Sequence, residues 1–395
     1  MTKTIVVLGA GIAAVSIIRQ VMRNVVLPSN EWKLVVVSPN THLHFPTPMP
    51  RVLIPGQIPD DKVFAALDLQ FGQYKDADKF EFILGVATQL DPTSKSVTVT
   101  PNADGGADRT ISYDKLLITT GARTVDGLPW KTLGSTEETR ALIAKLQSGI
   151  KAAKTIVVAG GGPTGTEMAG ELGSEYGKSG PNRKTIHFVY TGARPLDPQC
   201  MESVQRQAKT ELERLNIKLI PNTKVTASTT DPSTGVTTLQ LTANDGKTTS
   251  LETDVYLPAL GLVPNSGFVP ADLLDAAGQI KQTTTLQAEG YPDIFVAGDV
   301  GSLEPPKFTV ASSQAHHLAV HLPPHLKSGT PIPVYAPDTK NVLAVTLGRS
   351  KATGQMKGWK LPSIMVWLLK GRDLFLGLFD GFVLGKKVDY TVLEK

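Results

Sequence analysis

The chain has 395 residues, of which 41% are hydrophobic and 19% are charged. This length supports two or three domains, and the composition excludes collagen-like, low-complexity and disulfide-rich chains. The net charge of +4 is uneven, since residues 334–395 hold 10 Lys and Arg against 5 Asp and Glu while the rest holds 30 against 31. The basic surplus therefore belongs to the C-terminal segment, and we expect no nucleic acid as a partner.

A single cysteine, Cys200, limits the redox chemistry of this chain. One thiol can form neither an internal disulfide nor a redox-active pair, so electrons cannot pass through a dithiol here. We expect Cys200 to be a small apolar core residue in a reducing compartment. With neither a secretory signal nor, given Thr2, an N-myristoylation motif, the sequence predicts an intracellular, cytoplasmic protein.

The first predicted elements form a βαβ unit. Its strand, helix and strand are expected at 4–8, 12–24 and 33–37. The turn between the first strand and the helix holds Gly9, Gly11 and Ala14. Small residues at this spacing allow a tight turn, close approach of a pyrophosphate and packing of helix on strand. This turn therefore predicts a dinucleotide site at a helix N-terminus.

The middle of the chain connects this unit to a second one. A Pro-rich connection spans 38–60, and strands are expected at 80–85 and 95–100. A buried strand over 113–118 ends in the turn Thr119-Thr120-Gly121, and a helix follows at about 136–148.

The second βαβ unit repeats the pattern of the first. Its strand, helix and strand are expected at 155–159, 164–176 and 185–190. Gly160, Gly162 and Gly165 form its turn, with Thr164 opening the helix. Two such turns in one chain predict two dinucleotides held together, for which electron transfer is the usual chemical reason.

Three further elements complete the predicted order. An amphipathic helix is expected at about 199–214, and a strand at 253–257 runs toward Gly261. A strand within 291–297 then leads directly into Gly298-Asp299, an acidic turn at a strand end.

The two glycine turns, the Thr120-Gly121 turn and the Gly298-Asp299 turn stand in an order that resembles the two-dinucleotide-binding-domain flavoproteins. Within them the chain is most similar to the apoptosis-inducing-factor-like group, the ferroptosis-suppressor quinone reductases, and more distantly to type II NADH dehydrogenases. The resemblance covers essentially the whole chain, including Lys370-Gly371-Arg372-Asp373-Leu374-Phe375.

This resemblance implies an α/β fold with two Rossmann-like dinucleotide-binding domains, for FAD and NAD(P)H, plus a C-terminal α+β segment. The FAD domain is expected to be discontinuous. The expected bounds are 1–123 with 261–333 for FAD, 124–260 for NAD(P)H, and 334–395 for the C-terminal domain.

The resemblance also implies which residues bind the cofactors. For FAD these are Gly9, Gly11, Ala14, Ser38, Arg51, Thr120, Gly121, Gly298, Asp299 and Lys307. For NAD(P)H they are Gly160, Gly162, Thr164, Gly165, Tyr190, Arg194 and Gly261. Asp299 could instead cap a helix, and Arg51 could form an ordinary surface ion pair.

Two residues are candidates for catalysis. Glu167, one turn into the second unit's helix, would face the nicotinamide–flavin zone, or else be a solvated helix residue. His316, in Gln314-Ala315-His316-His317, could donate a proton to a reduced quinone, because histidine titrates near neutrality. Its alternative is a packing or capping role. No cluster with metal-ligand spacing is evident, so no metal is expected.

The sequence departs from the flavoprotein pattern after each second strand. An acid normally binds the adenosine ribose there, but the FAD half has Ser38 and the NAD(P)H half has Tyr190. Ser38 predicts weaker ribose binding than a carboxylate provides. Arg194 suits a 2′-phosphate, which favours NADPH or dual use, although Arg194 could only cap its loop while NADH is used.

The predicted chemistry is hydride transfer from NAD(P)H to flavin, followed by electron transfer to a second substrate. Without a dithiol, a quinone or similar small acceptor should meet the flavin directly. One alternative is a pathway-specific oxidoreductase with a dedicated organic substrate bound around 42–58 and 308–321. Another is an NAD(P)H-sensing death or signalling flavoprotein.

The C-terminal segment contains two apolar runs, 364–369 and 374–379, separated by Lys370-Gly371-Arg372-Asp373. Each is far shorter than the about 20 residues of a transmembrane helix. Apolar runs flanked by lysines and arginines suit a peripheral contact of 361–387 with anionic lipid. They equally suit a helix packed on the flavin domain or the seam of a homodimer.

Overall fold

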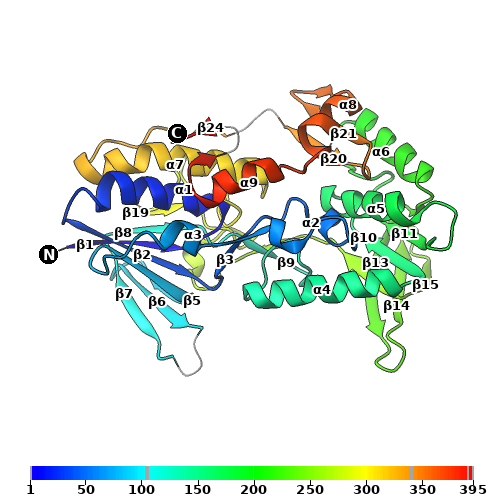
Figure 1. The fold of residues 1–395 in the computed structure, drawn as a ribbon, viewed down its shortest axis with the longest axis horizontal. Helices are drawn as coiled ribbons and strands as arrows, with labels where there is room; N and C mark the ends of the chain where they lie inside the picture. Colours follow the sequence, from blue (N-terminus) through cyan, green and yellow to red (C-terminus); the bar gives the residue numbers. More distant parts are fainter. Residues whose placement is uncertain (1, 103–105, 199, 338–340, 389–390, 394–395) are drawn as a thin grey trace.

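A computed structural model of the chain describes residues 2–102, 106–198, 200–337, 341–388 and 391–393. Two lobes lie side by side, each built on a sheet with helices packed against it (Figure 1). The expected α/β fold with two Rossmann-like units is confirmed. The carboxyl ends of the strands in both units carry the glycine turns, which is where ligands bind in such sheets.

The first lobe is built on an eight-stranded sheet. In spatial order its strands are β18 (Gln287–Ala288), β19 (Tyr291–Val296), β8 (Lys115–Ile118), β1 (Lys3–Leu8), β2 (Trp32–Ser38), β5 (Phe80–Asp91), β6 (Ser96–Pro101) and β7 (Arg109–Ser112). From β19 to β5 the neighbours run parallel, whereas β6 and β7 form an antiparallel extension. Short accessory strands, β3 (His42–His44) with β4 (Phe64–Ala66) and β9 (Ala122–Thr124) with β17 (Leu262–Pro264), pair outside it.

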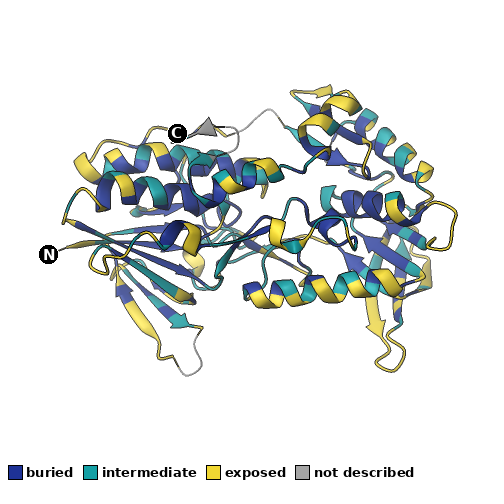
Figure 2. Cartoon of the chain, viewed as in Figure 1, coloured by how far each residue is buried: buried dark blue, intermediate teal, exposed yellow. Residues whose placement is uncertain are grey.

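Two helices cover one face of this sheet, α1 (Ile12–Val21) and α7 (Phe308–Ser328), which lie alongside each other in Figure 1. The strands beneath are almost entirely apolar because both faces of a parallel sheet are buried. Figure 2 shows the matching pattern of buried residues on the inner sides of the helices. Smaller helical turns complete the lobe: η1 (Met22–Val26), α2 (Met49–Val52), η2 (Asp60–Lys62), α3 (Asp68–Phe71) and η3 (Ala271–Leu273).

The second lobe has a parallel four-stranded sheet with a three-stranded antiparallel sheet beside it. The parallel sheet comprises β12 (Lys218–Ile220), β11 (Thr185–Val189), β10 (Thr155–Ala159) and β16 (Val255–Pro258). The antiparallel sheet comprises β13 (Thr223–Thr230), β14 (Thr237–Ala243) and β15 (Thr248–Thr253). Its helices are α4 (Thr136–Ala152), α5 (Pro163–Tyr176) and α6 (Glu202–Arg214).

The C-terminal segment touches both lobes. A small sheet packs on α5 and α6, whereas a helix contacts α1 in the first lobe. The elements are β20 (Leu343–Thr346), β21 (Ala352–Met356), β22 (Trp359–Lys360), α8 (Ser363–Val366), the π-helical turn η4 (Trp367–Gly371), α9 (Leu376–Val383), β23 (Lys387–Val388) and β24 (Thr391–Val392). None of the helices formed by the described residues has the length and apolarity needed to cross a membrane.

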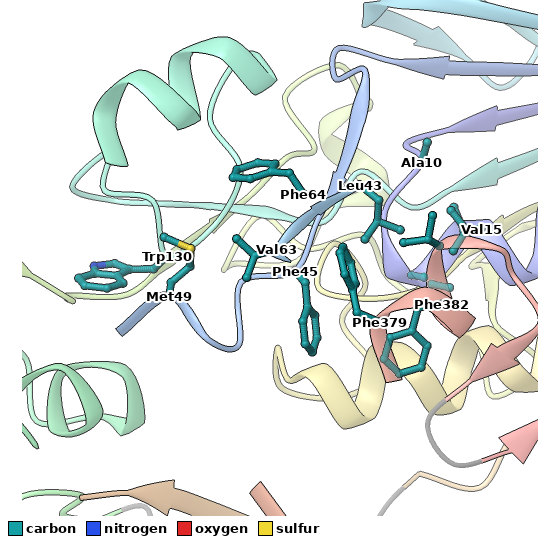
Figure 3. Packing of buried hydrophobic residues seen from close by; sticks show 14 of the residues in the cluster. Ala10, Val15, Leu43, Phe45, Met49, Val63, Phe64, Trp130, Phe379 and Phe382 are labelled. Atoms are coloured by element: carbon teal, nitrogen blue, oxygen red, sulfur yellow. The ribbon is translucent and has the colours of Figure 1, made fainter. Parts of the chain in front are cut away.

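The two apolar runs of this segment have different environments. Phe379 of α9 is buried and stacks on Phe45 at a ring-centroid distance of 5.4 Å, with Phe382 packed nearby (Figure 3). In contrast, Ile364 and Leu368 of the first run are exposed. The second run therefore packs in the hydrophobic core, whereas the first run buries Val366 but leaves Ile364 and Leu368 exposed.

The element bounds differ from the sequence expectation mainly at two places. The first helix stops being α-helical at Val21 and continues as the π-turn η1, which a hydrophobicity period does not reveal. The Pro-rich connection 38–60 is not a plain loop, because it contains β3 and α2. Pro at the start of α2 is compatible with a first helical turn, so proline did not exclude a helix there.

Candidate active site

A cavity of about 700 Å³ opens at the carboxyl ends of β1, β2, β8 and β19. Its volume falls in the range of small-molecule and cofactor sites. Seven of the residues predicted to bind FAD line it: Gly9, Gly11, Ser38, Thr120, Gly121, Gly298 and Asp299. Four separate segments of the sequence thus meet around one cavity.

The first glycine turn has the geometry that a dinucleotide requires. Gly9 has a φ of +97°, and an added Cβ there would lie 2.5 Å from the carbonyl oxygen of Thr119. At Gly11, which caps the N-terminus of α1 and lines the cavity, an added Cβ would meet no atom within 4 Å. The open space faces free N–H groups of a helix end, which suits a pyrophosphate.

Lys131 also lines the cavity and pairs with Asp299. Its Nζ lies 2.6 Å from Oδ2 of Asp299, whose side chain is almost buried. The backbone N–H of Gly298 donates to Oε1 of Gln314, which fixes the turn beside the acid. Lys131 was not predicted from the sequence, because no motif surrounds it and its partner lies 168 positions away.

His44 is a second cavity residue that the sequence did not reveal. Its ring stacks on Phe64 at 4.5 Å, and its Nε2 finds no hydrogen-bond partner among the described residues. Burial lowers the pKa of His44 to about 3, and the positive charge of Lys131 acts in the same direction. The imidazole is therefore neutral and offers an unpaired nitrogen at the edge of the cavity.

Ser38 occupies the position where an acid usually binds the adenosine ribose, at the end of β2. Its hydroxyl donates to the carbonyl of Asn40 at 3.3 Å and accepts from the Asn40 N–H at 3.2 Å. The hydroxyl is thus engaged in a local turn while Ser38 and Asn40 both line the cavity.

The second glycine turn has the same construction. Gly160 has a φ of +111°, and an added Cβ would collide with the Ala259 carbonyl. Gly162 caps α5, whose first residue is Pro163. Thr164 and Gly165 lie in the first turn of α5, and Gly261 has a positive φ and open space around it. Two glycine turns at helix N-termini are therefore present, as the spacing predicted.

Tyr190 and Arg194 lie in the loop after β11, beside this turn. The Tyr190 ring is buried, and an added Cβ on Gly161 would lie 2.9 Å from the Tyr190 Cβ. Nη2 of Arg194 lies 3.0 Å from Oε1 of Glu202, the first residue of α6. The residue that favours a 2′-phosphate therefore already has a carboxylate partner.

Glu167 lies where α5, β20 and η4 meet. It accepts from Lys370 Nζ at 2.5 Å and from the Thr346 N–H at 2.9 Å. Lys370 belongs to the sequence motif that carried the resemblance, but its partner Glu167 could not be predicted from that motif. Glu167 is thus a buried carboxylate, hydrogen-bonded through Oε1, rather than a solvated helix residue.

Arg51 of α2 forms a second buried ion pair, with Glu171 of α5, the helix that also contains Glu167. Its Nη2 lies 2.8 Å from Oε1 of Glu171, and its Nη1 donates to the Gly371 carbonyl at 3.1 Å. Burial raises the pKa of Glu171, and the charge of Arg51 opposes this rise. Arg51 would have to leave this pair to approach FAD as the resemblance implies.

Ala14, Lys307 and His316 do not line this cavity. Ala14 is buried under the sheet, as the packing position of the motif requires. Lys307 caps α7 and lines a smaller cavity of about 220 Å³. His316 lies on α7, where burial lowers its pKa and His321 adds to the effect. Its Nδ1 has no partner among the described residues.

Cys200 is buried and free, and burial raises the pKa of its thiol to about 11. A thiol with such a pKa is a poor nucleophile at neutral pH. Among the residues that the structure describes, no group of three His, Cys, Asp or Glu side chains is arranged to hold a metal ion.

Comparisons with known proteins agree with this arrangement. The sequence model of the family described as "Pyridine nucleotide-disulphide oxidoreductase" matches residues 3–315. Oxidoreductase ptaL of Pestalotiopsis fici is 38% identical over 375 residues, covering 95% of this chain and 96% of that protein. Ferroptosis suppressor protein 1 of Xenopus laevis is 25% identical over 310 residues, covering 78% and 79%. The predicted resemblance is confirmed.

A solved structure shows the same fold. The sulfide:quinone oxidoreductase of Aquifex aeolicus aligns with a TM-score of 0.77 and 17% identity, covering 99% of this chain and 93% of that one. At this identity the comparison shows the architecture alone.

Proposed function

The chain belongs to the pyridine nucleotide-disulphide oxidoreductase family, and we propose that it reduces a quinone or a similar small organic acceptor with electrons from NAD(P)H. It is an FAD-dependent NAD(P)H oxidoreductase. The acceptor is the proposed part. Bound FAD supplies the chemistry, since it takes a hydride from the nicotinamide and passes the two electrons on.

One observation carries the choice of acceptor. The description of the family names a disulphide. This chain has a single cysteine, Cys200, whose thiol is buried and has a raised pKa. No dithiol within the chain can relay electrons to a disulphide substrate. The acceptor must therefore come close to the flavin itself, which a flat organic molecule such as a quinone can do.

The cavity residues fit FAD. Gly11 and the N-terminus of α1 would hold its pyrophosphate, and Lys131 would supply a cation near it. Asp299 would accept from hydroxyls of the cofactor, and the unpaired Nε2 of His44 would find a partner there. Phe308 is an apolar residue of the cavity lining, and its ring stacks on that of Phe375 in the C-terminal segment at a centroid distance of 6.0 Å.

Glu167 and His316 remain the proposed groups around the reacting ends of the cofactors. Glu167, held by Lys370, would orient the nicotinamide from the first half of α5. His316, on the helix that follows Asp299, would supply a proton to the reduced acceptor.

Anaerobic stopped-flow absorbance in the flavin band tests the function. Purified holoenzyme is mixed with NADH or NADPH, and a soluble quinone is then added. Rapid bleaching followed by rapid reoxidation is expected. Slow reoxidation by every quinone, with fast bleaching, would instead favour a dedicated organic substrate, as for a pathway-specific oxidoreductase. Slow bleaching accompanied by a change in assembly would favour a sensor.

We also propose that the C-terminal segment binds an anionic membrane surface peripherally. Exposed apolar residues gather on α8, η4 and the adjoining strand: Trp359, Ile364, Met365, Leu368 and Leu369. Exposed cations accompany them: Lys357, Lys360 and Arg372. Apolar side chains with a basic rim suit the interface of an anionic bilayer.

Vesicle co-sedimentation tests this second proposal. The protein is expected to sediment with phosphatidylserine-containing vesicles, more weakly with phosphatidylcholine alone, and to lose binding in Ile364→Ser/Leu368→Ser. Leu69→Ser, an equally exposed leucine on α3, is the matched control. The protein could instead fail to bind vesicles and form a concentration-dependent dimer that Ile364→Ser/Leu368→Ser dissociates. That result would overturn the membrane proposal and assign the exposed apolar residues to a homodimer interface.

A further inference from the structure

The ion pair between Arg194 and Glu202 bears on which nicotinamide dinucleotide the second glycine turn accepts. This inference rests on the proposed function, because it concerns the electron donor of that reaction. Arg194 is the residue that suits a 2′-phosphate, yet its Nη2 lies 3.0 Å from Oε1 of Glu202. The guanidinium is therefore paired before any dinucleotide arrives.

The pair lies next to the second glycine turn. The backbone N–H of Leu196 donates to the Gly161 carbonyl at 2.7 Å, so the loop that contains Arg194 is fastened to the turn. The close approach of Tyr190 to Gly161 fixes the other end of the loop. In Rossmann units, residues just past the second strand surround the adenosine ribose. The carboxylate of Glu202 thus reaches the ribose end of the site from a different element, α6.

Two further features place positive charge or positive dipole ends beside the Glu202 carboxylate. It is the first residue of the thirteen-residue helix α6, where the helix dipole stabilises negative charge. A second cation, Arg206, lies with Nη1 3.5 Å from the same carboxylate oxygen. A carboxylate here satisfies Arg194 and places a negative charge where a 2′-phosphate would have to bind.

We infer that Glu202 is a specificity-determining residue that favours the dinucleotide with a free 2′-hydroxyl, NADH. A ribose hydroxyl can donate to a carboxylate, whereas a phosphate is repelled by it and must also displace it from Arg194. The side chains of Arg194 and Glu202 are 34% and 56% exposed, so solvent screens the effect. We expect a change of about tenfold rather than complete exclusion of NADPH.

The oxidised dinucleotides NAD⁺ and NADP⁺ provide a binding test that needs no turnover. Their dissociation constants are measured by titration calorimetry on the holoenzyme, for wild type and Glu202→Gln. The glutamine keeps the shape and removes the charge. NADP⁺ affinity relative to NAD⁺ is expected to rise about tenfold, and Arg194→Ala in the same background is expected to cancel this gain.

Glu213→Gln is the matched control, because Glu213 lies on the same helix and pairs with Lys209 instead. It is expected to leave the ratio unchanged. An unchanged ratio in Glu202→Gln, with wild type binding NAD⁺, overturns this inference and leaves the proposed function standing. A wild type that binds NADP⁺ more tightly than NAD⁺ overturns it as well. Failure to bind either dinucleotide, with no bleaching by NADH or NADPH, overturns the proposed function itself.

Discussion

The ammonium group of Lys131 lies 2.6 Å from a carboxylate oxygen of Asp299, and both residues line the cofactor cavity. Lys131 belongs to the connection between the two βαβ units, whereas Asp299 lies in the turn that follows β19 (Tyr291–Val296). The ion pair therefore ties a loop to the acidic turn and holds a positive charge inside the cavity that we propose accepts the FAD pyrophosphate.

Replacing Lys131 by Ala is expected to weaken FAD binding about tenfold, since a charge-assisted contact to the cofactor is lost. The measurement is a fluorescence titration of the FAD-stripped protein with FAD. Lys145→Ala is the control, because Lys145 is an exposed lysine of α4. Equal FAD affinity in both variants would show that Lys131 only anchors its loop.

His44 is expected to make stability depend on pH. Its pKa of about 3 in the folded chain lies below the ordinary 6.5, so the unfolded chain binds more protons between these values. The contribution of His44 to the free energy of unfolding is therefore fully present above pH 6.5 and is lost as the pH drops toward 3. The expected slope is at most about 1.4 kcal/mol per pH unit.

His44→Phe tests this slope, because an aromatic ring can keep the stack on Phe64 but cannot titrate. Urea unfolding at a series of pH values should show that the wild type loses stability relative to the variant as the pH falls from 6.5 toward 3. Parallel curves for wild type and His44→Phe would contradict burial of a neutral imidazole.

Local sequence patterns predicted the parts of the site that lie close together in the chain. Gly9 and Gly11, and likewise Gly160 and Gly162, follow strands and open helices, so strand and helix periodicity was enough to place them. The turn at Asp299 was also recognisable, because it directly follows a buried strand.

Partners that are distant in the sequence could not be predicted. Lys131 and Asp299 are 168 positions apart, and Glu167 and Lys370 are 203 apart. Their pairing depends on how the connection and the C-terminal segment pack on the lobes, which no local pattern encodes. Arg194 and Glu202 are close in the chain, but their pairing depends on how the loop after β11 turns back to the start of α6, which no periodic pattern indicated.

Phe379→Ala is expected to lower the free energy of unfolding by about 3–5 kcal/mol, because it leaves a cavity beside Phe45 and Phe382. Leu368→Ala removes an exposed side chain of the same segment and should change stability by less than about 0.5 kcal/mol. Urea unfolding measures both. Equal small losses would mean that α9 does not belong to the core of the first lobe.

The buried ion pair of Glu167 and Lys370 can be tested by removing each partner, because an unpaired buried charge lowers the free energy of unfolding. Lys370→Met leaves Glu167 with the Thr346 N–H but without a cation, and about 3–5 kcal/mol of stability should be lost. Glu167→Gln should also destabilise, since it leaves a buried ammonium group unpaired.

The double variant Glu167→Gln/Lys370→Met is expected to be more stable than the sum of the two losses predicts, because it removes both charges while the glutamine carbonyl still accepts from Thr346. Urea unfolding of the four proteins gives the coupling energy. The exposed pair of Lys209 and Glu213 provides the reference cycle, where about 0.3–0.5 kcal/mol is expected. Additive losses at Glu167 and Lys370 would mean that the C-terminal segment is not fastened to α5 through this pair, and that Glu167 is free to act on the nicotinamide without it.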